Sequence, residues 1–368
     1  MTLSLDAAAG RPAVPAAAQV DIAAEAVRIT ARGPLSAALL EVLADHESGG
    51  AERLPQLAHE AVLVEDPIAD DDVQLSLFLL YSLAYGSLPQ LGAQWEWDTS
   101  VLAARAALER AFEDALRAVV DVPALPEPTP QAVAETLFAL TAPQPGPSLS
   151  RHVARRPDIA QARELLVSRS IYTLREADAH SWVIPRLTGR AKAALIEIQS
   201  DEYGGGRTER MHQVMYARAM RGAGLDDTYG AYVDLVPALT IASFNMMTMF
   251  GLNRRLRGAA IGHLAAFEMT SSLPCRAIAE GLRRVGFGDD VAAYYDEHVE
   301  ADAVHEQIAG RDLAGGLAED EPALLPDILF GAAACLAIDG WGGEQILQAW
   351  ERGESSLRGG SAVAVVGS

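Results

Sequence analysis

Cysteine and aromatic side chains are both scarce in this sequence of 368 residues. The two cysteines, Cys275 and Cys335, form neither a C-x-x-C pair nor a disulfide framework, which fits a reducing cytoplasm. Aromatic residues make up 6% of the chain, and alanine and leucine dominate over β-branched residues. Because this mixture favours helices over strands, the composition predicts an all-α protein.

Basic residues are also few: 29 Lys and Arg face 50 Asp and Glu, for a formal net charge of −21. Such a charge repels phosphate backbones and argues against a nucleic-acid partner. The first residues lack a basic segment followed by an apolar core, so we expect no signal peptide. The most apolar stretch, 235–252, contains Pro237 and several polar residues. It predicts a buried core helix of a cytoplasmic protein rather than a membrane span.

Proline-rich segments indicate how the chain is divided. Residues 1–25 are rich in Ala and Pro and are expected to form a flexible arm. The segments "DVPALPEPTP" and "TAPQPGPS" break helices, and the second marks the predicted domain boundary. The sequence thus predicts an N-terminal helical region for support or dimerisation (26–148), a main helical domain (149–353) and a flexible tail (354–368). Within the main domain, helices are expected near 158–187, 191–203, 208–222, 228–253, 257–284, 288–310 and 322–353.

One helical segment, "YYDEHVEADAVHEQIAG", carries the clearest chemical pattern. At about 100° per residue, His298, Asp302 and His305 project from one face within about 60°. Two imidazoles flanking a carboxylate on one stripe are typical of metal ligands. The alternative is a solvated polar face on an acidic helix.

Three further residues could join this stripe. Glu202 and His212 are separated by three consecutive glycines, and such a break can turn both side chains towards one point. Glu209 is a rival for Glu202, because Glu209 and His212 have the i, i+3 spacing of ferritin-like di-iron bundles. Glu268 lies among apolar residues, where an acid is costly to bury unless it is paired or bound to metal.

Glu176, in "YTLREADAHSW", is less distinctive by itself, because it could pair with Arg175 or His180 on its own helix. The order of the whole set nevertheless resembles the haem-oxygenase-like di-iron oxidases, a family of iron-containing redox enzymes, over roughly residues 150–350. The resemblance implies an all-α, haem-oxygenase-like helical bundle with six metal ligands. A seventh carboxylate at the place of Glu176 resembles the N-oxygenase branch, which includes the N-oxygenase of the streptozotocin pathway. The implied ligands are Glu176, Glu202, His212, Glu268, His298, Asp302 and His305.

The resemblance also implies an activity: two iron ions use O2 as co-substrate to oxidise a nitrogen to N-hydroxyl or nitro. The substrate would be an amine, guanidine or amino-heterocycle, such as 2-aminoimidazole or an amino acid, in natural-product biosynthesis. Four carboxylates would balance the +4 charge of two Fe(II) ions, which makes burial tolerable. We expect neither haem nor flavin, and because nucleotide-binding glycine motifs are absent, electrons must come from an external donor. A homodimer is also expected.

Other functions remain open at this stage. A desaturase or C–C lyase of the same superfamily, a ferritin-like iron-binding protein that uses Glu209, and a metal-free helical scaffold are the alternatives. Tyr203, Phe244, Asn245 and Met249 lie beside predicted ligands or in the apolar helix and could contact a substrate. Core packing is the competing explanation for these four residues.

Overall fold

The computed structural model describes residues 27–44, 49–156, 158–360, 363 and 365, without the side chains of residues 300–303. The expected flexible arm, 1–25, lies outside the described residues. The described residues contain helices and turns but no strand, so the prediction of an all-α fold is confirmed. The α-helices are α1 (Pro34–Ala44), α2 (Leu54–Ala61), α3 (Asp71–Tyr85), α4 (Thr99–Val119), α5 (Pro130–Thr141), α6 (Leu149–Arg155), α7 (Ile159–Thr173), α8 (Asp178–Ser181), α9 (Gly189–Glu202), α10 (His212–Gly222), α11 (Ala238–Leu252), α12 (Arg257–Arg284), α13 (Asp289–Gln307), α14 (Gly316–Asp320) and α15 (Leu325–Glu351).

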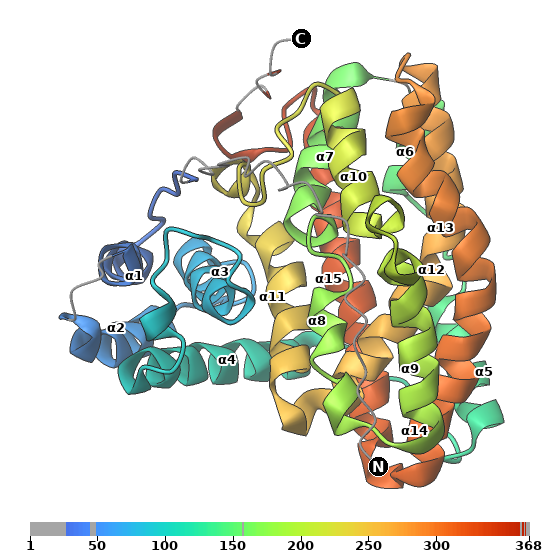
Figure 1. Cartoon of the computed structure of the whole chain (residues 1–368), viewed down its shortest axis with the longest axis horizontal. Helices are drawn as coiled ribbons and strands as arrows, with labels where there is room; N and C mark the ends of the chain where they lie inside the picture. Colours follow the sequence, from blue (N-terminus) through green and yellow to red (C-terminus); the bar gives the residue numbers. More distant parts are fainter. Residues whose placement is uncertain (1–26, 45–48, 157, 361–362, 364, 366–368) are drawn as a thin grey trace, which may run out of the picture.

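Figure 1 shows two groups of helices on either side of α11. Helices α1 to α4 form a smaller group on one side, and the long helices α12, α13 and α15 run through the larger group on the other. Helix α5 precedes the predicted boundary at 141–148, yet it packs against the π-helical segment Ile308–Gly315 of the larger group. The larger group therefore begins before the proline-rich joint that was predicted to delimit it.

Helix α11 is the buried core helix that the apolar stretch predicted. The Asn245 amide donates hydrogen bonds to the backbone carbonyl and the side-chain oxygen of Gln74 in α3, at 2.8 and 2.9 Å. Tyr85 at the end of α3 lies 3.0 Å from the hydroxyl of Thr248. Because α11 is covered on both sides, it needs apolar residues around its whole circumference.

Helices α12 and α15 form the closest pair of the larger group. A Cβ added at Gly262 in α12 would lie 1.8 Å from the Ile328 carbonyl oxygen, and one at Gly331 in α15 would lie 2.0 Å from the Ala259 carbonyl oxygen. Only glycine permits this approach of two backbones. Among the described residues, the stretch Pro322–Glu351 is also the one that is long and apolar enough to cross a membrane, and 56% of its apolar window is buried inside the fold. Its burial against α12 is that of a core helix.

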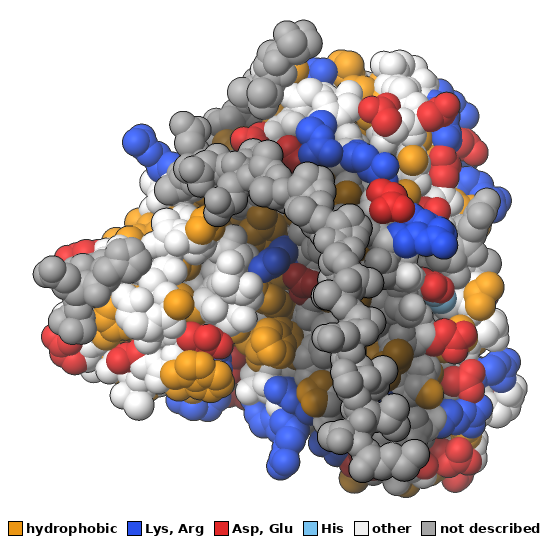
Figure 2. Space-filling view, in the orientation of Figure 1, with side chains coloured by type: hydrophobic (Ala, Val, Ile, Leu, Met, Phe, Trp, Pro, Cys, Tyr) orange, Lys and Arg blue, Asp and Glu red, His pale blue; other side chains and the backbone are white. Residues whose placement is uncertain are grey.

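Two predicted helices differ from those observed, and the predicted tail begins too early. The helix expected over 158–187 breaks after Thr173, and the one expected over 228–253 begins only at Ala238, because Pro237 stands at its start. In the predicted tail, the Ser356 amide and hydroxyl donate to the buried Glu164 carboxylate at 2.8 and 2.6 Å. On the face shown in Figure 2, acidic and basic side chains alternate over the larger group.

Candidate metal centre

Glu176 enters the interior from the break between α7 and α8. Its neighbour Ala177 has φ 72°, a left-handed conformation that is uncommon for any residue except glycine. The Gln199 side chain donates a hydrogen bond to the Ala177 carbonyl at 2.8 Å and so holds this turn. The Glu176 carboxylate accepts a hydrogen bond from the Tyr294 hydroxyl, whose oxygen lies 2.7 and 2.8 Å from the two carboxylate oxygens. The irregular backbone therefore directs a buried carboxylate towards α13.

Glu202 and His212 are brought together by the glycine segment between them. Glu202 is the last residue of α9 and His212 the first of α10, and Gly204, Gly205 and Gly206 all have positive φ. A Cβ at Gly204 would lie 2.6 Å from the backbone of Arg210, so the chain can double back only with glycine there. The result is a distance of 3.0 Å between His212 Nδ1 and a Glu202 oxygen, with both side chains buried.

The remaining described ligand candidates come from two adjacent long helices. Glu268 lies on α12, and His298 and His305 lie two turns apart on α13. His305 Nδ1 is 3.3 Å from a Glu268 oxygen, and His298 Nε2 is 3.4 Å from a Glu176 oxygen. Asp302 is on the same helix, but its side chain lies outside the described part of the structure.

These residues form two overlapping sets of potential metal ligands. The first set is Glu176, Glu202, His212 and His298, and the second is Glu202, Glu268 and His305. Within each set, one ligand atom per residue lies within 4.8 Å of all the others, and every member is buried. Glu202 belongs to both sets. A carboxylate has two oxygens, so Glu202 can face two adjacent metal ions at once.

In two imidazoles, the ring nitrogen that points away from the ligand sets makes a hydrogen bond, and this fixes which nitrogen points towards the metal ligands. His298 Nδ1 lies 2.8 Å from the Tyr294 carbonyl oxygen, and His305 Nε2 lies 3.0 Å from the Asp201 carboxylate. In the neutral form of each imidazole, these acceptors hold the proton on the outer nitrogen, so the lone pair is on the inner nitrogen. Imidazoles that ligate metals are commonly oriented in this way.

The charges of the cluster balance each other even without metal. Burial alone would raise the pKa of Glu202, but His212, His298 and His305 lower it below its ordinary value. Burial alone would lower the pKa of His298, but the Glu176 carboxylate raises it well above its usual range. Burial opposes protonation of His305 as well, yet Glu268 and Asp201 raise its pKa to about 9. Without metal, protonated imidazoles can thus neutralise the charge of the buried carboxylates.

The donors suit iron or manganese. His212 Nδ1 and His298 Nε2 are buried and face carboxylate oxygens, but neither makes a hydrogen bond of acceptable geometry. An imidazole nitrogen and a carboxylate oxygen at this distance can share a proton, and a metal ion can take the place of that proton. Mixed carboxylate and imidazole donors without thiolates match iron or manganese rather than a zinc–thiolate site. The residues present therefore fit the two iron ions that the family resemblance implies.

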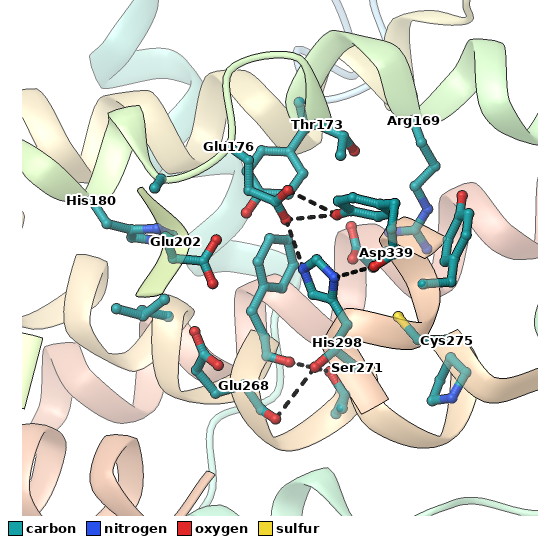
Figure 3. Close-up of a pocket in the computed structure, with 18 of the residues that line it drawn as sticks. Arg169, Thr173, Glu176, His180, Glu202, Glu268, Ser271, Cys275, His298 and Asp339 are labelled. Atoms are coloured by element: carbon teal, nitrogen blue, oxygen red, sulfur yellow. Dashed lines mark hydrogen bonds and ion pairs between the residues drawn. The ribbon is translucent and has the colours of Figure 1, made fainter. Parts of the chain in front are cut away.

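A cavity of about 170 Å³ adjoins the cluster. Glu176, Glu202, Glu268 and His298 form part of its wall, and Phe267 and other apolar side chains form another part. In Figure 3, His180 lies at one end and Arg169, Asp339 and Cys275 lie at the other, with Glu176 and His298 between them. The cavity thus extends from the metal-ligand candidates to a charged end.

The predicted substrate-binding residues lie elsewhere in the fold. Phe244, Asn245 and Met249 are buried on α11, and Tyr203 donates a hydrogen bond to Asp178 at 2.8 Å. None of the four is among the residues that line the cavity, so this placement gives no support to their predicted role. Glu209, the rival of Glu202, is exposed and belongs to neither ligand set.

Sequence analysis did not identify Asp201, Tyr294, Arg169 or Asp339. Nothing in the local sequence sets Asp201 and Tyr294 apart, because their roles depend on contacts with His305 and Glu176. Arg169 and Asp339 did carry a signal: each is a single charge inside an otherwise uncharged helical segment, "LLVSRSIYT" and "ACLAIDGW".

Comparison with known families agrees with this geometry. Residues 163–340 match the sequence model of a family described as iron-containing redox enzyme. The matched segment includes both ligand sets and the charged end of the cavity. No curated protein matches the chain.

Proposed function

We propose that this protein is a non-haem di-iron N-oxygenase, in which the two ligand sets that share Glu202 hold two iron ions. The shared carboxylate is the observation that carries the proposal, because a single-metal site needs no bridge. The match to iron-containing redox enzymes supports iron as the metal. Glu176 supports the N-oxygenase branch, since it adds a further carboxylate to the set around His212 and His298.

The proposed reaction takes one molecule of O2, two electrons and two protons per round. It converts an amine, guanidine or amino-heterocycle nitrogen into its N-hydroxyl derivative and water, and repeated rounds lead to a nitro group. Bound iron would supply the redox chemistry that activates O2. The electrons come from an external donor, and we expect the enzyme to act in the cytoplasm, as a homodimer, in natural-product biosynthesis.

The protein's own residues have three tasks in this reaction. Tyr294 holds the Glu176 carboxylate, while the Tyr294 carbonyl and Asp201 hold His298 and His305 in the orientation required of ligands. Apolar groups around the cavity exclude bulk water: the Tyr172 and Phe267 rings, for example, pack with their centroids 5.4 Å apart. The cavity leaves space beside Glu176 and His298 for a small molecule.

Iron loading and product analysis test the proposal together. Protein incubated with Fe(II) without oxygen should bind about two irons per chain. Exposure of the loaded, reduced protein to O2 and a panel of amines, guanidines and aminoazoles should add oxygen to at least one of them, as detected by mass spectrometry. Iron uptake well below two per chain would exclude a di-iron enzyme.

Glu176→Ala tests the branch assignment. If Glu176 is a ligand, this variant should lose iron or nitrogen oxidation, whereas the exposed Glu209→Ala should keep both. Survival of both properties in Glu176→Ala would show that Glu176 is not a required ligand and that the assignment of seven ligands is wrong. Loss of iron in Glu209→Ala alone would favour the ferritin-like alternative.

A further inference from the structure

The turn that carries Glu176 contains a strained residue. Among the residues that the structure describes, Ala177 is the one other than glycine with a left-handed backbone, at φ 72°. Glycine usually takes such a position at the end of a helix, because a Cβ makes this conformation costly. Helix α7 ends at Thr173 and α8 begins at Asp178, so Ala177 lies in the short turn between them. Contacts from the surrounding fold must therefore hold Ala177 in this conformation.

The last turn of α9 supplies these contacts. Gln199 is buried there, and its amide nitrogen donates to the Ala177 carbonyl and to the Ser181 hydroxyl, both at 2.8 Å. A carbonyl oxygen only accepts hydrogen bonds, so this contact fixes the orientation of the Gln199 amide. Glu202, the member shared by both ligand sets, lies in the same turn of α9. One helical turn thus carries Glu202 and also contacts the backbone beside Glu176.

Hydrogen bonds continue in one direction from Gln199 to Asp178. The Tyr203 hydroxyl donates its only proton to the Asp178 carboxylate at 2.8 Å, so the Ser181 hydroxyl, 3.0 Å away, is the donor to Tyr203. The Ser181 oxygen in turn accepts from Gln199. Because Asp178 is the first residue of α8, this chain reaches the same turn from its other side. Hydrogen bonds that follow one another in this way polarise and strengthen each other.

From this arrangement we infer that Gln199 and Tyr203 are positioning residues for the Glu176 carboxylate. They hold Ala177 in its left-handed conformation, and this conformation turns Glu176 into the ligand set that it shares with Glu202. The inference rests on the proposed function, in which that set holds an iron ion. For Tyr203, this role differs from the substrate contact that the sequence predicts.

The balance between strain and hydrogen bonding makes this turn sensitive to single substitutions. The cost of a left-handed alanine is comparable with the stabilisation that one or two hydrogen bonds provide. In Gln199→Leu, the side chain cannot donate, so the turn can relax to an ordinary conformation and move the Glu176 carboxylate out of its set. Glycine adopts the left-handed conformation without this cost. Ala177→Gly should therefore make the turn independent of Gln199.

A rescue experiment provides the test, with Fe(II) binding to the full chain measured by calorimetry without oxygen. Gln199→Leu should bind Fe(II) about tenfold to a hundredfold more weakly than the wild type, as is typical when a group that orients a metal ligand is removed. Ala177→Gly alone should bind Fe(II) as the wild type does. Added to Gln199→Leu, it should recover most of the loss, although it supplies no metal donor. Unchanged affinity in Gln199→Leu, or a loss that Ala177→Gly does not recover, would overturn the inference.

A matched pair of tyrosine variants tests the rest of the chain. Tyr203→Phe removes one link and should weaken Fe(II) binding by less than Gln199→Leu, because the contact of Gln199 with Ala177 remains. The control is Tyr232→Phe, which removes a hydroxyl that accepts from the Asp226 amide at 2.8 Å. Tyr232 belongs to neither ligand set and does not line the cavity, so its loss should leave Fe(II) affinity unchanged. If Tyr203→Phe binds Fe(II) no more weakly than Tyr232→Phe, the role assigned to Tyr203 is wrong.

Crystal structures of the metal-free protein separate the inference from the proposed function. The Tyr294 hydroxyl lies 2.7 and 2.8 Å from the Glu176 oxygens, and in Gln199→Leu these distances should exceed hydrogen-bond reach. They should return to their original values when Ala177→Gly is added. A wild type that binds fewer than two irons would refute the di-iron enzyme, yet these structures would still decide the inference. Normal iron binding together with an unmoved Glu176 in Gln199→Leu would overturn the inference alone.

Discussion

Glu202 is the residue on which the two halves of the metal centre depend. It is the last residue of α9, it is buried, and it belongs to both ligand sets. Its position follows from the glycine segment that returns the chain to His212. A single side chain therefore couples the two proposed iron ions.

This coupling predicts an unequal response to two neighbouring substitutions. Glu202→Ala should reduce iron binding from about two ions per chain to one or none, because both sets lose a donor. Glu209→Ala, seven residues away on an exposed turn, should leave the stoichiometry unchanged. Metal analysis after anaerobic loading measures both. Two tightly bound irons in Glu202→Ala would disprove a bridging role.

A second prediction at the scale of one residue concerns His263. It is fully buried on α12 with its Nδ1 3.3 Å from His180 Nε2, and burial followed by His180 lowers its pKa well below the ordinary value. The unfolded chain takes up a proton at this residue below about pH 6.5, while the folded chain does not, so acid removes stability. When the pH falls from 7.5 to 5, the free energy of unfolding should therefore decrease by about 2 kcal/mol less in His263→Gln than in the wild type.

Denaturant unfolding of both proteins at the two pH values gives this difference. The exposed His59 on α2 serves as the control for the loss of a histidine, in His59→Gln. An identical pH dependence in wild type and His263→Gln would show that His263 has the same pKa in the folded and the unfolded chain, which would contradict the prediction.

At the scale of elements, the contact between α12 and α15 fixes the frame that carries Glu268 and Asp339. A Cβ at Gly331 would lie 2.0 Å from the Ala259 carbonyl oxygen, whereas one at Gly342 on the same helix would meet no atom within 4 Å. Gly331→Ala should destabilise the protein by about 1–3 kcal/mol through overpacking. Gly342→Ala should stabilise it by about 0.5–1 kcal/mol, because alanine favours a helix. Denaturant unfolding distinguishes the two, and equal effects would argue against close packing at Gly331.

Helical periodicity predicted most of these elements, because each helix must bury one face. It failed where tertiary contacts override local preference. Helix α7 ends after Thr173, and the turn that follows is stabilised by Gln199, a residue of another helix. This turn directs Glu176 towards α13, a contact that the local sequence does not reveal. The late start of α11 could have been predicted from Pro237.

The metal-ligand candidates could be predicted from the sequence because histidines and buried acids are chemically distinctive and spaced by the helical period. The cavity could not be predicted from the sequence. Arg169 and Asp339 are 170 positions apart and meet at one cavity only through the packing of α7 and α15 around it. The residues predicted to bind substrate were chosen for their proximity in sequence to the ligands. On α11, that proximity leads instead to the core against α3.

At the scale of the whole molecule, α11 joins the smaller N-terminal group to the larger one. Arg32 donates hydrogen bonds to the carbonyls of Val233 and Val236, just before α11, at 2.6 and 2.8 Å. Asn245 in the middle of α11 binds Gln74 of α3, and both side chains are fully buried. These contacts favour a supporting role for the N-terminal helices, since without them α11 would expose an apolar face.

If the two groups share this core, they should unfold together. Asn245→Ala removes the donor to two buried acceptors of Gln74 and should cost about 1–3 kcal/mol. Hydrogen exchange followed by mass spectrometry should show the same loss of opening free energy in α3 and in α12, because one cooperative unit contains both. Thr240→Ala, on the same helix, should change stability by less than about 0.5 kcal/mol in either place. A loss confined to α1 to α4 would instead identify two independently folding units, and the N-terminal helices would then be free to serve another purpose, such as dimerisation.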